Sequence, residues 1–179
     1  MRKLMTIAFG VIGAVVVLVL LVAAIGASLP VDHVASVTAT YARPPDDVWR
    51  AITDFQSFPS WRPGVDRVEA RTFDDGSSGW VEYGSTGPLP MAVVEQVPLR
   101  RLVLRIASDE LPFGGTWTYE LEPTEGGTRV TITEDGTVSN VIFRFVARFV
   151  MGHTATMRTY LIGLGNHFGE QVEPVALPR

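Results

Sequence analysis

The stretch PPDDVWRAITDF (residues 44–55), followed closely by FPSW (residues 58–61), indicates more about the fold of this chain than any other stretch. Its two prolines end a preceding strand, and its two aspartates are favourable at a helix N-terminus. Val48, Ile52 and Phe55 then recur at helical spacing, which predicts one buried helix face. We therefore expect a short helix, followed by a turn that buries the second tryptophan.

Alternating apolar and polar residues predict short strands on both sides of this helix. The predicted strands cover residues 34–41, 65–71, 80–83, 91–97, 101–106, 116–122 and 128–134. Glycine-containing turns, such as those at residues 74–76 and 125–127, separate several of them. Regular spacing with short turns favours an antiparallel meander.

The last part of the chain is predicted to be helical. Asn140 is a suitable N-cap for a helix that begins at Val141. Farther along, apolar residues at positions 157, 161, 164 and 168 form one helical stripe. Glycines at positions 163, 165 and 169 either allow this helix to approach the sheet closely or fray it.

This order of elements, with its motifs, resembles the START/Bet v 1-like (SRPBCC) superfamily, in its polyketide cyclase/dehydrase-like branch, over roughly residues 34–173. The motifs are Pro45-x-x-Val48-Trp49, Phe58-Pro59-x-Trp61, Gly115-Thr116-Trp117 and Gly127-Thr128-Arg129-Val130-Thr131. The resemblance implies an α+β helix-grip fold, in which a curved antiparallel sheet of about seven strands wraps around a long C-terminal helix. It also implies a cavity for an apolar molecule, and it assigns no catalytic residue.

An uncharged, strongly apolar stretch covers residues 4–29. It is long enough to cross a bilayer, which takes about 20 apolar residues. Arg2 and Lys3 precede it, and the four residues that follow it contain no lysine or arginine. By the positive-inside rule, the N-terminus lies in the cytoplasm and the following domain lies on the extracytoplasmic side.

We therefore expect a single-pass protein of the cell membrane. Residues 1–31 form the cytoplasmic tip and the transmembrane helix, and residues 32–179 form the START/Bet v 1-like ligand-binding domain. A cleaved signal peptide is the alternative, because alanines near the end of the stretch offer a cleavage site. Against it, the apolar region of a signal peptide usually has only about 7–15 residues.

Composition excludes several functional classes. The chain of 179 residues has a net charge of -4, so we expect no nucleic acid partner. It has no cysteine, which excludes disulfides, thiol nucleophiles and cysteine-ligated metals. Its one lysine, Lys3, lies outside the domain, which excludes Schiff-base chemistry there. Only three histidines are present, and we expect neither a metal nor a cofactor.

Candidate ligand contacts are the residues that we expect to face the cavity. Trp117 and Tyr119 share one face of their strand, although they could equally fill the core. Trp80 and Tyr83 fall on opposite faces of theirs, and Tyr83 is favoured as the inward residue. The expected ligand contacts are Trp61, Tyr83, Leu104, Trp117, Tyr119, Glu134, Met157, Tyr160, Leu161 and Leu164.

Two of these residues also suggest proton-transfer chemistry. An inward Glu134 would have a raised pKa and could act as an acid or base, whereas a solvated position at the strand end is the alternative. Tyr160 lies seven residues from both His153 and His167, a spacing that places each pair on one helical face. Such pairs can polarise a carbonyl, but hydrogen bonding within the helix explains them better.

Residues 141–151 are strongly apolar, yet they carry Arg144 and Arg148. Arginine beside aromatic residues on a helix can lie in a membrane interface, so this helix is a candidate second membrane contact. The alternative is that it packs on the sheet, with its arginine side chains reaching into water.

The sequence thus predicts a membrane-anchored binding protein for a hydrophobic small molecule, such as a lipid, an isoprenoid or a polyketide-like compound. Two alternatives stay open. One is a cyclase- or dehydratase-type enzyme that acts on such a molecule. The other is a ligand-free membrane interaction module with a filled core.

Overall fold

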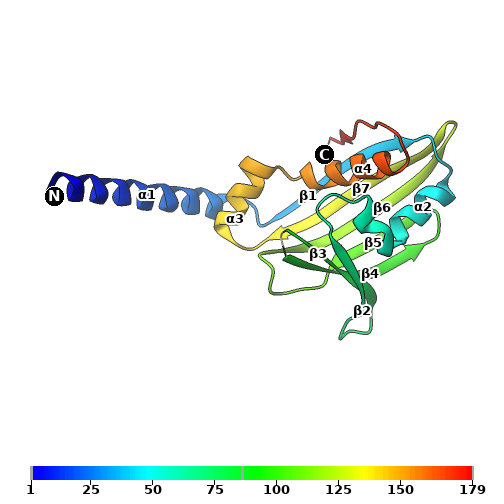
Figure 1. The fold of residues 1–179 in the computed structure, drawn as a ribbon, viewed down its shortest axis with the longest axis horizontal. Helices are drawn as coiled ribbons and strands as arrows, with labels where there is room; N and C mark the ends of the chain where they lie inside the picture. Colours follow the sequence, from blue (N-terminus) through cyan, green and yellow to red (C-terminus); the bar gives the residue numbers. More distant parts are fainter. Residues whose placement is uncertain (1, 86, 179) are drawn as a thin grey trace.

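The computed structural model describes residues 2–85 and 87–178, with side chains described from residue 9 onward. A long N-terminal helix projects from a domain in which helices lie against one curved sheet (Figure 1). The helices are α1 (Arg2–Ser28), α2 (Pro45–Thr53), the 3-10 helix η1 (Phe55–Ser60), α3 (Val141–Val146), the π-helical turn η2 (Ala147–Met151) and α4 (Ala155–His167). The strands are β1 (Asp32–Tyr41), β2 (Arg67–Thr72), β3 (Ser78–Gly84), β4 (Gly87–Val97), β5 (Arg101–Ile106), β6 (Phe113–Thr124), β7 (Gly127–Val138) and β8 (Val175–Ala176).

The sheet has the order β2-β3-β4-β5-β6-β7-β1-β8, and every neighbouring pair is antiparallel. Seven strands are long, and β8 adds a two-residue edge beside β1. Helix α4 lies along the sheet (Figure 1). The predicted α+β helix-grip fold is therefore confirmed.

The predicted first helix is α2, preceded by the two prolines. Pro45 occupies its first turn together with Asp46 and Asp47, where negative charge favours the helix dipole. Its inward face contains Val48 and Ile52, both almost fully buried. The chain then tightens into η1 and buries Trp61, as the sequence predicts.

Helix α4 buries the predicted apolar stripe, because Met157, Leu161 and Leu164 are fully buried. The Tyr41 hydroxyl donates a hydrogen bond of 2.8 Å to the Leu161 carbonyl oxygen and ties this helix to β1. Close approach requires glycine at position 163, where a Cβ would lie 2.7 Å from a ring carbon of Pro63. The close approach at Gly163 is therefore to the loop after η1 that carries Trp61 and Pro63, and not to the sheet as expected.

Strand boundaries differ from the prediction at β4. Residues 87–90 were expected to be a loop because they contain Pro88 and Pro90, but β4 begins at Gly87. These residues pair with β3, whereas the pairing with β5 starts only at Met91. Proline has no backbone N–H to donate. Because residues 87–90 do not pair with β5, no hydrogen bond to β5 is lost and proline is tolerated in this part of the strand.

Helix α1 is almost entirely exposed outside the domain. Within the described residues, Phe9–Ser28 is the helical segment long and apolar enough, by length and composition, to cross a membrane. Its apolar side chains, such as Val17 and Leu20, are exposed rather than packed. This arrangement agrees with the predicted membrane anchor.

Candidate functional site

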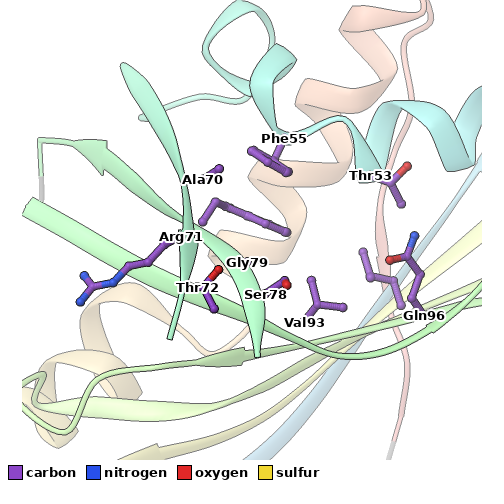
Figure 2. A pocket seen from close by; sticks show the side chains of 11 residues that line it. Thr53, Phe55, Ala70, Arg71, Thr72, Ser78, Gly79, Val93 and Gln96 are labelled. Atoms are coloured by element: carbon purple, nitrogen blue, oxygen red, sulfur yellow. The ribbon is translucent and has the colours of Figure 1, made fainter. Parts of the chain in front are cut away.

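A groove of about 430 Å³ opens between the junction of α2 with η1 and the strands β2 to β5 (Figure 2). Six elements contribute to its walls, and most contribute at least one apolar side chain. The lining residues are Thr53, Phe55, Ala70, Arg71, Thr72, Ser78, Gly79, Trp80, Val93, Gln96 and Leu102. Its volume falls within the range of about 300–1,000 Å³ that is typical of small-molecule sites.

Aromatic rings form the inner wall of the groove. The rings of Phe55 and Trp80 stack with centroids 5.0 Å apart and an interplanar angle of 9°. Figure 2 shows Phe55 on the side opposite Val93 and Ser78. Trp80 is almost fully buried, so this stack separates the groove from the interior of the domain.

A β-bulge in β4 directs a polar side chain into the groove. Val93 pairs with Leu104, Gln96 pairs with Leu102, and the register shifts between Val93 and Glu95. Val93 and Gln96 are three residues apart, so in a regular strand their side chains would point to opposite faces. The extra residue of the bulge puts both on the same face. With the bulge, the Gln96 amide lines the groove and can donate to or accept from a ligand.

A buried ion pair lies directly behind the aromatic wall. The Trp80 indole N–H donates a hydrogen bond of 2.9 Å to Glu82 Oε1, and the Arg62 guanidinium pairs with the same carboxylate. Only 12% of the Arg62 side chain and 5% of the Glu82 side chain are exposed. Burial by itself lowers the pKa of Arg62, but Glu82, Tyr119 and Tyr160 together raise it by more, so the net shift is upward and the guanidinium stays charged.

The Arg62 guanidinium also contacts a buried aromatic cluster. It lies 5.1 Å from the centroid of the Tyr160 ring, within the range of a cation–π interaction. The Tyr160 ring in turn lies 5.3 Å from Trp61, 5.4 Å from Tyr119 and 6.3 Å from Trp117, between centroids. These four rings pack against one another where the sequence predicted an open cavity.

Both tyrosine hydroxyls of this cluster stay protonated near neutral pH. Burial raises the pKa of Tyr119 and of Tyr160 well above the ordinary value, and the two hydroxyls are hydrogen-bonded to each other. A neutral phenol can donate a hydrogen bond, but its raised pKa makes it a poor proton donor in catalysis. The cluster is therefore better suited to orient a polar group than to transfer a proton.

The structure brings most of the predicted contacts together but encloses them. Trp61, Trp117, Tyr119 and Tyr160 form the aromatic cluster described above. Leu104, Met157, Leu161 and Leu164 are buried in the same hydrophobic core. None of the ten predicted residues lines the groove, and their role as ligand contacts stays a prediction.

Tyr83 was predicted to face inward, and that orientation is wrong. Its hydroxyl donates a hydrogen bond of 2.9 Å to Glu69 Oε2, and its ring lies 3.9 Å from the Arg67 guanidinium carbon. All three residues lie on the outer surface of β2 and β3. Because side chains alternate along β3, the outward position of Tyr83 turns Trp80 and Glu82 inward.

Glu134 lies on β7, far along the sheet from β3, and it is within the strand rather than at its end. Strand β7 continues through Gly136 to Val138, so the predicted strand end is wrong. The Glu134 carboxylate faces His33, with Oε1 and Nε2 3.4 Å apart, and burial raises the pKa of Glu134 to about 7. The His33 ring stacks on the ring of His153 with centroids 4.0 Å apart.

Gly136 makes room for this histidine. A Cβ at that position would lie 2.5 Å from a ring carbon of His33. His153 precedes the first residue of α4, so it does not share a helical face with Tyr160, and that expectation is wrong. We call His33, His153 and Glu134 the histidine cluster.

The sequence analysis missed all of the groove-lining residues and both residues of the ion pair; Arg62, Trp80, Glu82 and Gln96 are the four on which the site depends most. One signal was present, because Trp80 and Glu82 are two residues apart and must share a face. The other two gave no signal, since Arg62 lies in a loop without periodicity and Gln96 turns inward only through the bulge.

A second depression, of about 680 Å³, lies beside the turn between β4 and β5. Charged side chains, including Arg100, Arg101, Glu120 and Glu122, form much of its lining. Arg101 bonds to both Glu95 and Glu120 there. An apolar ligand would have to desolvate these charges, so the first groove is the better candidate.

Comparisons with known proteins agree with the architecture. Residues 32–160 match the family model described as "Polyketide cyclase / dehydrase and lipid transport". A search of curated proteins gives no match. The family match begins where α1 has ended and β1 begins.

Solved structures share the fold at low sequence identity. A protein from Mesorhizobium loti is 15% identical with a TM-score of 0.58, covering 76% of this chain and 97% of its own. A START superfamily protein from Mycobacterium smegmatis is 14% identical with a TM-score of 0.57, covering 75% and 96%. The di-domain ARO/CYC protein StfQ of the steffimycin biosynthetic pathway is 17% identical with a TM-score of 0.54, covering 78% of this chain and 52% of its own.

Proposed function

Because this chain belongs to the polyketide cyclase / dehydrase and lipid transport family, we propose that it is a membrane-anchored protein that binds an apolar small molecule carrying a polar group. The ligand class is a lipid, an isoprenoid or a polyketide-like compound. The ligand occupies the groove between η1 and strands β2 to β5. Its apolar part contacts Phe55, Trp80 and Leu102, and its polar group bonds to Gln96.

The observation that carries this proposal is the combination of an open groove with a charged pair behind its aromatic wall. Small-molecule sites are mostly apolar, with a few polar groups that fix orientation. The groove has this composition, and the Arg62–Glu82 pair bonds directly to Trp80 in its wall. The pair holds the indole in one orientation and so keeps the wall in place.

The buried aromatic cluster and the core residues beside it form the inner part of the proposed site. Trp61, Trp117, Tyr119 and Tyr160 lie behind the ion pair, and we propose that they contact the end of a longer ligand when the Phe55–Trp80 stack opens. Leu104, Met157, Leu161 and Leu164 extend this inner surface. Glu134 contributes from β7, where it pairs with Trp117 on the same face of the sheet.

Helix α1 is the proposed anchor. Its apolar segment Phe9–Ser28 has 20 residues, enough to cross the hydrocarbon core. Arg2 and Lys3 keep its N-terminus in the cytoplasm, so residues 32–179 lie on the extracytoplasmic side as the ligand-binding domain. Carbonate washing of membranes with intact-mass measurement tests this assignment, and a mature protein that starts near Ser28 and is released by the wash would refute it.

Native mass spectrometry of the full chain, released from a mild detergent, tests ligand binding. We expect the wild-type protein to retain an apolar compound. Ser78→Trp places an indole in the groove (Figure 2) and should abolish this retention. Val94→Trp is the matched control, because Val94 is exposed and does not line the groove.

A ligand-free interaction module is the competing function, and the packed aromatic cluster favours it. If the core is simply filled, both the wild type and Ser78→Trp will carry no compound. They will also bind a dansyl-labelled fatty acid equally weakly. Binding that is lost only in Ser78→Trp excludes this alternative.

A further inference from the structure

Helices α3 and η2 expose an apolar surface that the groove does not involve. We define it as the apolar ridge, which consists of Ile142, Phe149, Val150 and Met151. Val150 is 72% exposed and Phe149 is 59% exposed. Ile142 lies in α3, and the other three residues follow one another in η2. Exposed apolar patches of this kind mark contacts with proteins or membranes.

The opposite side of the segment is fixed to the domain. The Phe143 ring stacks on Phe113 with centroids 5.7 Å apart. The Asn140 side chain accepts hydrogen bonds of 3.0 and 2.9 Å from the backbone N–H groups of Ile142 and Phe143. The ridge therefore points outward because the other face of α3 is already packed.

The same segment is also fixed to the end of α1. Gly26 and Val141 are in such close contact that a Cβ on Gly26 would lie 1.9 Å from the Val141 carbonyl oxygen. The Arg144 guanidinium donates hydrogen bonds of 3.0 Å to the Leu29 carbonyl and 3.0 Å to the Val138 carbonyl. These bonds join the linker after α1, the end of β7 and α3 into one junction.

This junction sets the depth of α3 relative to a bilayer. The apolar segment Phe9–Ser28 has 20 residues, about 30 Å of helix, which equals the thickness of the hydrocarbon core. Gly26 lies about 3 Å before its end. If α1 spans the membrane, α3 starts at the boundary between hydrocarbon and headgroups. Figure 1 shows α3 leaving the end of α1 sideways rather than extending it.

We propose that the apolar ridge inserts into the same bilayer as α1 and forms a second, interfacial membrane contact. This inference rests on the proposed anchoring by α1, but not on the proposed ligand. Residues 141–151 contain no acidic residue; because Arg144 is bonded to backbone carbonyls, Arg148 is the arginine of this segment that can meet lipid phosphates. Arg148 is exposed beside Phe149. The bilayer is the expected occupant because α1 places it against the ridge.

A second contact would restrict the orientation of the domain. One transmembrane helix alone lets a domain tilt about its linker, whereas two contact points on one side hold it in a fixed orientation to the membrane. The domain would then present the rest of its surface, including the groove, in a constant direction.

Lipid quenching in the full-length chain tests this inference. The chain has no cysteine, so single cysteines can be labelled with a fluorophore without background. Val150→Cys reports on the ridge, Val16→Cys reports on α1, and Val94→Cys is an exposed valine on β4 as the matched control. Each labelled protein is reconstituted into phosphatidylcholine vesicles, with and without lipids that carry a quencher near the headgroup end of the acyl chain.

We expect quenching at positions 16 and 150 and none at position 94. Quenching at position 16 without quenching at position 150 would overturn the ridge contact and leave the anchor intact. No quenching at either position would overturn both. Quenching at position 150 alone would refute the anchor, and with it the proposal that the ridge inserts into the bilayer beside α1.

A charge reversal in the ridge provides the second arm. Phe149→Glu should lower the quenching at position 150 by at least about threefold, since a carboxylate is costly to insert among acyl chains. Val94→Glu should leave it unchanged. Circular dichroism confirms that both variants are folded, and unchanged quenching in folded Phe149→Glu would contradict the proposal.

Discussion

Glu82 and Glu134 lie toward opposite ends of one sheet, on strands β3 and β7, and the charged or titratable group beside each of them differs. Glu82 on β3 has a guanidinium beside it, and Glu134 on β7 has an imidazole. Arginine is permanently charged, so it compensates for the burial of Glu82. His33 gives no such fixed charge, and burial raises the pKa of Glu134 to about 7. The same residue type is thus a structural ion in one region and a titratable group in the other.

The largest expected effect is at the ion pair. Glu82→Gln leaves the Arg62 guanidinium buried without its counter-ion, and it should lower the free energy of unfolding by about 3–5 kcal/mol. Thermal unfolding of the detergent-solubilised chain, followed by near-UV circular dichroism, measures this loss. Glu69→Gln, which breaks the exposed pair with Arg67, is the control and should change stability by less than about 1 kcal/mol.

The double variant Arg62→Met/Glu82→Leu sharpens this result. It removes both charges from the interior, so it should recover most of the stability that Glu82→Gln loses. If the double variant is as unstable as the single one, packing rather than charge compensation holds this region together. The difference between Glu82 and Glu134 could then not be attributed to the charge of the neighbouring side chain.

The next effect concerns the space around the histidine cluster. Gly136→Ala adds a methyl group where a Cβ would lie 2.5 Å from the His33 ring. Crowding of this kind should lower the free energy of unfolding by about 1–3 kcal/mol. Gly126→Ala is the control, because a Cβ there meets nothing within 4 Å. Equal stability of the two variants would show that His33 does not occupy this position.

A smaller and pH-dependent effect is expected at Glu134. Its pKa is about 7 in the folded chain, compared with an ordinary value of 4.5. Between these pH values the folded state binds more protons than the unfolded state, so this residue makes stability fall as pH rises. Glu134→Gln should therefore be about 1–2 kcal/mol more stable than the wild type at pH 8 and nearly equal to it at pH 4.5.

The charge on the histidines near Glu134 decides whether Glu134 lowers stability as the pH rises. His33 faces the carboxylate directly, and His153 stacks behind His33. A charged His33 would stabilise ionised Glu134 instead. Glu134→Gln would then be less stable than the wild type near pH 6, and that result would remove the contrast with Glu82.

The smallest effect is expected on the outer face of β3. Tyr83→Phe removes a hydroxyl that bonds to the exposed Glu69, so stability should change by less than about 0.5 kcal/mol. Ligand retention in native mass spectrometry should also be unchanged. A loss of ligand in this variant would place the site on the opposite face of β3 from Glu82.

The sequence carried enough information for the architecture because its signals are periodic. Prolines and aspartates before an apolar helical repeat predicted α2, and alternation predicted most strands. The predicted start of β4 was wrong, because proline was assumed to exclude a strand. The residues around Pro88 and Pro90 pair with β3 alone, and proline is compatible with that pairing. The apolar N-terminal helix followed from length and composition alone, and its role as an anchor is part of the proposed function.

The site was less predictable because it depends on contacts between distant segments. The face of β3 could not be chosen when each side offered an aromatic residue, Trp80 or Tyr83. Arg62 and Glu82 meet only after η1 folds over the sheet, and Gln96 turns inward only through a bulge. Periodicity reports which side of an element is buried, but it does not report which buried side chains leave space between them.

Photo-crosslinking in the full chain tests the central claim most directly, namely that an apolar molecule occupies the groove beside the Arg62–Glu82 pair. A fatty acid with a diazirine on its acyl chain is irradiated with the reconstituted protein, and the modified residues are mapped by mass spectrometry. The account predicts modification of Phe55, Trp80 and Leu102, and its loss in Ser78→Trp. Modification confined to α1 and the apolar ridge, with none in the groove, would contradict it.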